Sequence, residues 1–238
     1  MNVSDEDAIG LLRTLQLADS FFPTGAYAHS QGLEGMVALG WIGNAQEVHE
    51  YLSYLLTGAV LPSDGVALLH SHRSAADGDV CTVIEIDHLL HAMKLPKEMR
   101  VASTHSGRRV LDESRALLAA GAVPAALEGY RAAVVKGEAP GSGAVAFGVC
   151  TWAQGIWEEA ALLSYCHSFA VGVLGAAQRL LPITHGEAQE VLRSLHSLVV
   201  EVAADIRTSH WRDMTSFSPL ADIASMRHET AEVRMFAS

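Results

Sequence analysis

The chain has 238 residues, with 16 Lys and Arg against 27 Asp and Glu, and a formal net charge of −11. This excess of acidic groups argues against binding to nucleic acid or to an anionic membrane surface, because both need a basic face. Half of the residues are hydrophobic, which is enough for a core, and three scattered cysteines form neither a disulfide framework nor a zinc knuckle. The acidic N-terminus lacks the basic start of a signal peptide, so a cytoplasmic protein is expected.

Apolar residues recur through most of the chain at about 3.6-residue spacing, the pattern of amphipathic helices. Alternation typical of strands is scarce, and the ambiguous segment 80–86 is assigned to a helix because Asp87 and two leucines follow it closely. Groups of proline and glycine, such as Pro62-Ser-Asp-Gly65, predict turns. In chain order, the expected helices are 8–18, 48–59, 86–93, 97–120, 125–136, 160–181 and 188–206.

No repeat, low-complexity tract or long linker divides the sequence. We therefore expect one all-α domain, a helical bundle that spans 1–238. The N-terminus, at about 1–7, is expected to be flexible, and the C-terminal segment, at about 219–238, is expected to be a docking tail.

The segment 160–181 is apolar and long enough to cross a bilayer. However, His167 and Arg179 lie within it, and the flanks of a membrane span are missing. Gly172 and Gly175 offer a small-residue face on which another helix can approach closely. A buried central helix is the better interpretation.

The twelve histidines raise the possibility of a metal site, and the best local pairs are His88/His91 and His70/His72. Two histidines three apart on a helix share a face, but a site needs three or four ligands and no third one is placed by spacing. We therefore expect no metal or cofactor, with direct nickel carriage by surface histidines such as His88 and His91 as the alternative.

Sequence motifs of enzymes are also missing. There is no GxSxG elbow and no Walker loop. A site assembled from distant residues stays open, because catalytic groups meet in space rather than in sequence. The expectation is a protein that is not an enzyme.

The two ends of the chain carry the most unusual sequences. A helix should stop at residues 23–25, and a second one should begin soon afterwards and carry His29 and Glu34. The last twenty residues are dense in Arg, His, Met and Phe. Such a tail needs apolar anchors if it is to dock on its own body or on a partner. The candidate anchors are Met226, Val233, Met235 and Phe236.

These two segments resemble the UreF family of urease accessory proteins. The resemblance rests on "PTGAYAHSQGLE" at 23–34, on "DIASMRHET" at 222–230 and on "RMFAS" at 234–238. Weaker matches keep the family order between them: Glu98-Met-Arg100, Ser103, Gly107-Arg-Arg109, Ala146-Phe-Gly148, Arg179-Leu-Leu-Pro182 and Gln189. The chain departs from the pattern at Gly143, where relatives often have histidine, and at Ile183-Thr-His185, where many have Leu-Gly-Gln.

The resemblance implies an all-α, dimeric protein that acts through protein contacts. It implies an adaptor that bridges the scaffold accessory protein UreD (UreH in some systems) and the GTPase UreG. This complex inserts nickel into apo-urease at the expense of GTP. The C-terminal tail is then expected to become ordered on meeting the scaffold protein.

The resemblance also carries residue roles over to this chain. Tyr27 and Arg179 match positions linked to the GTPase face, and the tail residues match the docking element. The partner-binding residues that it implies are Tyr27, His29, Glu34, Arg179, Pro182, Met226, Arg227, His228, Glu229, Arg234 and Phe236.

Overall fold

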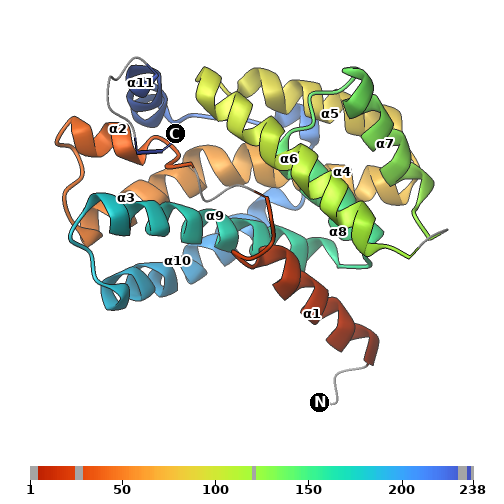
Figure 1. Ribbon diagram of the computed structural model, residues 1–238, viewed down its shortest axis with the longest axis horizontal. Helices are drawn as coiled ribbons and strands as arrows, with labels where there is room; N and C mark the ends of the chain where they lie inside the picture. The colour runs from red at the N-terminus through yellow and green to blue at the C-terminus, as the bar shows by residue number, and fades with distance from the viewer. Residues whose placement is uncertain (1–4, 25–28, 120–121, 230–234, 237–238) are drawn as a thin grey trace.

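A computed structural model describes residues 5–24, 29–119, 122–229 and 235–236, and shows helices packed side by side (Figure 1). Within these residues there is no β-strand, which confirms the all-α prediction. Buried hydrophobic residues from α1 to α11 form one continuous core. The helices are α1 (Asp5–Ala18), α2 (Leu33–Ala38), α3 (Ala45–Leu55), the π-helix η2 (Leu56–Gly65), α4 (Val66–Ala76), α5 (Val80–Met93), α6 (Lys97–Leu117), α7 (Ala125–Lys136), α8 (Gly143–Ala153), α9 (Glu158–Leu180), α10 (His185–Ile206), the 3-10 turn η3 (Trp211–Asp213) and α11 (Pro219–His228).

The helices α3, η2 and α4 run on without a break, so the turn predicted at Pro62-Ser-Asp-Gly65 is wrong. Proline lacks a backbone N–H and normally breaks a helix, because it leaves the carbonyl four residues earlier without a donor. Here the carbonyl of Gly58 accepts instead from the N–H of Phe217, at 2.8 Å. The carbonyl of Pro62 accepts from the N–H of Thr215, at 3.2 Å. The segment between α10 and α11 therefore lies along η2, which sets the position of α11.

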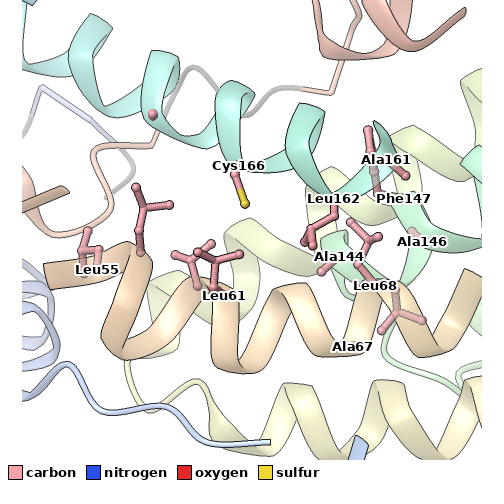
Figure 2. Close-up of a cluster of buried hydrophobic side chains, with 14 of the residues drawn as sticks. Leu55, Leu61, Ala67, Leu68, Ala144, Ala146, Phe147, Ala161, Leu162 and Cys166 are labelled. Atoms are coloured by element: carbon pink, nitrogen blue, oxygen red, sulfur yellow. The ribbon is translucent and has the colours of Figure 1, made fainter. Parts of the chain in front are cut away.

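The core is built around α8, every residue of which is buried from Gly143 to Thr151. It packs between α4 and α6. The close contact with α4 requires a glycine at position 148 of α8, because a Cβ there would collide with the carbonyl of Leu68. Figure 2 shows this core, in which side chains of α4, α8 and α9 meet, Cys166 among them. Burial raises the pKa of the Cys166 thiol to about 12, so this cysteine stays neutral and packs as a small apolar residue.

Two helical runs are long and apolar enough to cross a membrane, Ala45–Ala76 and Glu158–Leu180. In their most apolar windows, 67% and 50% of the residues are buried inside the protein. The second run is α9, which packs against α1, α8 and α10. Core helices of folded bundles meet the same length and composition criterion, and the packing of α9 agrees with the expected central helix.

Most expected helices are present, with shifted ends. The ambiguous segment 80–86 is helical, as the first half of α5. At the N-terminus, α1 already begins at Asp5, within the segment that was expected to be flexible. The helices α4 and α8 were not expected at all.

Candidate partner-binding site

The helix α11 lies directly against α2, so the two end segments pack on each other (Figure 1). Their backbones approach closely, since a Cβ on Gly35 would lie 2.5 Å from the carbonyl oxygen of Ala224. Gly32 faces the carbonyl of Ala221 in the same way, and its φ of 82° lies in the left-handed region that favours glycine. Gly32 and Gly35 are therefore explained by the close approach of α11.

A second contact comes from the carboxylate of Glu34, which holds three groups of the C-terminal segment. Its Oε1 accepts from the backbone N–H of Met235, at 2.8 Å, and its Oε2 accepts from that of Phe236, at 3.0 Å. The same Oε2 lies 2.9 Å from Nε2 of His228. Glu34 thus fixes both the last turn of α11 and the residues near the end of the chain.

His228 lies between two carboxylates. While Nε2 faces Glu34, Nδ1 lies 3.1 Å from Oε2 of Glu98, on α6. The side chains are 3% exposed for His228, 13% for Glu34 and 18% for Glu98, so water competes little with these contacts. We call Glu34, Glu98 and His228, together with the amides of Met235 and Phe236, the C-terminal clasp.

Two further contacts extend the clasp to neighbouring helices. Oε1 of Glu229 accepts from the backbone N–H groups of Lys97 and Glu98, at 2.8 and 3.3 Å. These amides belong to the first turn of α6, where a carboxylate is favourable because the helix N-terminus has free donors and a positive dipole end. At the end of α9, the guanidinium of Arg179 lies 5.5 Å from the centre of the buried Phe236 ring, a cation–π contact.

The outer side of α11 is apolar and exposed. Phe217, Leu220, Ile223 and Met226 follow each other at intervals of three residues, and between 43 and 72% of each residue is exposed. Leu220, Ile223 and Met226 lie within α11 and therefore share one side of the helix, whereas Phe217 precedes its first residue. We call these four residues the apolar row. The buried side of α11 carries Ala221, Ala224, Ser225 and His228, and its exposed side carries the large apolar side chains.

Comparison with known proteins identifies the family. The model of the UreF family matches residues 42–196, more than half of the chain. The chain belongs to the UreF family. The urease accessory protein UreF of Trichodesmium erythraeum is 33% identical over 227 residues, which cover 95% of this chain and 96% of that protein. The proteins of the same name from Paenarthrobacter aurescens and a Bradyrhizobium species are 33 and 29% identical, covering 94 and 99% of this chain and 96 and 95% of their own lengths.

The family model ends before α11, but the alignments to these relatives extend over nearly the whole chain. These relatives are named urease accessory proteins, so the chain belongs to a family of urease accessory proteins. Among the residues that the family resemblance implies, Glu34, His228 and Phe236 lie together in the structure.

The family-implied residues fall into two groups by exposure. Glu34, His228, Glu229 and Phe236 are buried or partly buried and bind other parts of the chain. These contacts position the C-terminal segment on α2 and α6. The exposed members, available to a partner, are Arg179, Pro182, Met226 and Arg227.

Three other residues need separate mention. His29 is partly buried and lines a pocket, and it precedes α2, so the prediction that it lies on the second helix is wrong. Tyr27 and Arg234 lie outside the described residues. From the sequence, Glu98 was only part of a weak family match. The apolar row was not predicted as a group, although apolar residues at every third position from 217 to 226 indicate a shared surface.

A pocket of about 180 Å³ lies beside η2, α6, α9 and the segment that leads into α11. Nζ of Lys94 lies 2.8 Å from Oδ2 of Asp64, and the hydroxyl of Tyr165 donates to Oδ1 of Asp64 at 3.1 Å. Burial raises the pKa of Asp222, which also borders the pocket. The chain thus contains internal partners for the charges of Asp64 and Lys94.

The histidine pairs do not form a metal site in the part of the chain that the structure describes, which holds no group of three potential ligands. Nε2 of His88 lies 2.9 Å from the carbonyl oxygen of Glu138. Nε2 of His70 and of His72 lie 2.8 Å from the carbonyl oxygens of Ser209 and Ile156. These imidazoles are therefore positioned by the backbone of other segments.

Proposed function

We propose that this UreF-family protein is an adaptor that bridges the scaffold accessory protein UreD (UreH) and the GTPase UreG during GTP-dependent nickel insertion into apo-urease. One observation carries the proposal. The clasp holds the C-terminal segment on α2, and the apolar row is exposed on the opposite side of α11.

The scaffold protein is the partner that we assign to the apolar row. Three exposed apolar side chains on one side of α11, with the exposed Phe217 just before it, are typical of an interaction site rather than of a free surface. Aromatic residues and methionine are enriched at protein interfaces, and Phe217 and Met226 are of these kinds.

The GTPase is the partner that we assign to the surface around Arg179. Arg179 is exposed, and its guanidinium lies over Phe236, so it connects the end of α9 with the end of the chain. Arginine is enriched among residues that dominate interface energies. Since the clasp ties this surface to α11, a partner on one can influence a partner on the other.

The proposal includes a cytoplasmic homodimer with a single helical domain per chain. The apolar side of α1, with Ile9, Leu11, Leu12 and Leu15 each about half exposed or more, is the surface that we expect a second copy to cover. Sedimentation of the purified protein tests this point, and a species of single-chain mass, 25.4 kDa, would contradict it.

Direct nickel carriage by His88 and His91 has no specific observation in its favour, because His88 already contacts the backbone of Glu138. Equilibrium dialysis with nickel distinguishes the two functions. Tight stoichiometric binding that His88→Ala/His91→Ala removes would replace the adaptor proposal.

Capture on tagged scaffold protein tests the docking assignment. The double variant Ile223→Asp/Met226→Asp places two charges on the apolar row, and capture should fall at least tenfold because carboxylates resist burial. Val200→Asp is the matched control, since Val200 is 58% exposed on α10, away from α11. Full capture of the double variant, with its helical content unchanged, would refute the assignment.

A further inference from the structure

The charges of the chain are divided unevenly along the sequence. Residues 94–136, which include α6 and α7, hold eight of the 16 Lys and Arg but only four of the 27 Asp and Glu, a formal charge of +4. Since the total is −11, the rest of the chain carries −15. Figure 1 shows α6 running across the front of the bundle, and one of its sides packs on α8. A basic region therefore lies on the surface of an acidic protein.

The exposed side of α6 carries much of this positive charge. Four exposed residues follow each other at intervals of four, four and three positions, so they share one side of the helix: Lys97, Val101, His105 and Arg108. Arg109 is exposed next to Arg108. We call these five residues the basic face. At about 1.5 Å of rise per residue, the backbone positions of Lys97 and Arg108 are about 16 Å apart.

The motif Gly107-Arg-Arg109 contains one residue that internal packing explains and two that it does not. Gly107 is buried, and a Cβ there would collide with the carbonyl of Gly141, so α6 packs closely on the segment that leads into α8. The two arginines point away from this contact and are exposed. Within the described residues, their guanidinium groups form no hydrogen bond or ion pair.

The nearby carboxylates are engaged by other groups. Asp112, which follows the two arginines on α6, binds Arg131 of α7 at 2.9 Å. Glu128 of α7 accepts from Arg115 at 2.8 Å, and Glu98 belongs to the clasp. An acidic residue placed four positions after a basic one is also the less favourable order for an ion pair on a helix. The charge of the basic face is thus available to a partner.

We propose that the basic face of α6 binds an acidic segment of a partner protein. Charge complementarity selects this partner, because carboxylates can pair with Lys97 at one end and with Arg108 and Arg109 at the other. Arginine suits this role, since its guanidinium binds a carboxylate through two parallel hydrogen bonds. An extended chain rises about 3.3 Å per residue, so about five residues span the face. Val101, 57% exposed, lies between the two ends and offers a contact for an apolar side chain.

A short acidic segment fits this face better than a nucleic acid or an anionic membrane does. Those partners are extended polyanions, and they would also meet the rest of the protein, which carries −15. A segment of a few residues can lie along α6 alone. None of the five side chains takes part in the clasp or the apolar row, so this inference does not rest on the proposed function.

The test uses the purified full-length chain and a fluorescent peptide in which one leucine separates two groups of three glutamates. Fluorescence anisotropy measures the dissociation constant of the peptide. Arg108→Glu reverses one charge of the basic face. Arg193→Glu is the matched control, because Arg193 is also an exposed arginine within a long helix, α10, and the change in net charge is the same. Circular dichroism checks the helical content, and Arg109→Glu repeats the test if Arg108→Glu loses it.

We expect the peptide to bind at low salt and to bind more weakly as salt rises, because salt screens exposed charges. Arg108→Glu should weaken binding by about fivefold or more, since an attractive charge becomes a repulsive one, whereas Arg193→Glu should change it by less than about twofold. No binding at low salt, or equal losses in the two variants, would overturn the proposal.

A polyanion control separates the classes of partner. A single-stranded oligonucleotide with as many charges as the peptide, and vesicles that contain phosphatidylserine, should each bind more weakly than the peptide. Tighter binding of the oligonucleotide or of the vesicles, lost in Arg108→Glu and kept in Arg193→Glu, would overturn the assignment to an acidic protein segment and replace it with a nucleic acid or a membrane surface.

Discussion

The helices at the two ends of the chain are attached to the bundle in different ways. Both α1 and α11 expose apolar side chains, but α11 is held by the buried carboxylates and imidazole of the clasp. By contrast, α1 buries Gly10, Thr14 and Leu17, and the guanidinium of Arg13 donates to the carbonyl of Gln154 at 2.7 Å. The attachment of α11 depends on several buried ionisable groups, whereas α1 has a single guanidinium hydrogen bond beside a small buried side, so one substitution should loosen α11 more than α1.

The largest effect is expected for Glu34→Ala, which removes the acceptor of two backbone amides and of His228 at once. A buried donor without a partner costs about 1–3 kcal/mol, and breaking a buried charged contact costs about 3–5 kcal/mol. We expect the opening free energy of the C-terminal segment to fall by about 3 kcal/mol. Hydrogen exchange at Met235 and Phe236 measures it.

Arg13→Ala is the counterpart on α1. It removes one partly buried hydrogen bond, so a local loss of about 1 kcal/mol is expected there, with no change in exchange at Phe236. Equal losses of protection in the two variants, each at its own end of the chain, would show that the two attachments do not differ as described.

A smaller effect is expected for Gly35→Ala. Its Cβ would lie 2.5 Å from the carbonyl oxygen of Ala224, so α11 has to shift away from α2. Such overpacking typically costs about 1–3 kcal/mol. Thermal or urea unfolding measures the loss, and increased exchange at His228 would place it at α11.

Gly172→Ala is the matched control in α9. Among the described residues, no atom outside its own helix and neighbours lies within 4 Å of a Cβ built there. Because alanine favours a helix over glycine by about 1 kcal/mol, this variant should be slightly more stable than the unmodified chain. A Gly35→Ala variant that gains stability in the same way would mean that α11 is not packed as the structure shows.

The sequence predicted helices where one side is apolar and the other polar, as in α9 and α10. It missed α8 because that helix is buried all round, so Gly143–Ala153 has no polar side to define a period. It assigned a turn at Pro62 because the donors that complete the helix there, the amides of Thr215 and Phe217, lie about 150 residues away in the chain.

The candidate site was predicted in its members but not in its arrangement. The resemblance pointed to Glu34, His228 and Phe236 as partner-binding residues. No local spacing relates Glu34 to His228, which are 194 positions apart, so their mutual contact became visible only in three dimensions. That contact shows that these residues position the C-terminal segment, and we propose the apolar row as the surface that meets a partner.

The central claim is that this protein bridges two partners through separate surfaces. Its most direct test is the mass of the complex formed when scaffold protein, GTPase and this chain are mixed in the presence of GTP and magnesium. The scaffold protein and the GTPase should co-elute only when this chain is added. Arg179→Ala should keep the scaffold protein and lose most of the GTPase, whereas Arg193→Ala, exposed on α10, should keep both. Co-elution of the two partners without this chain, or full GTPase retention by Arg179→Ala, would contradict the account.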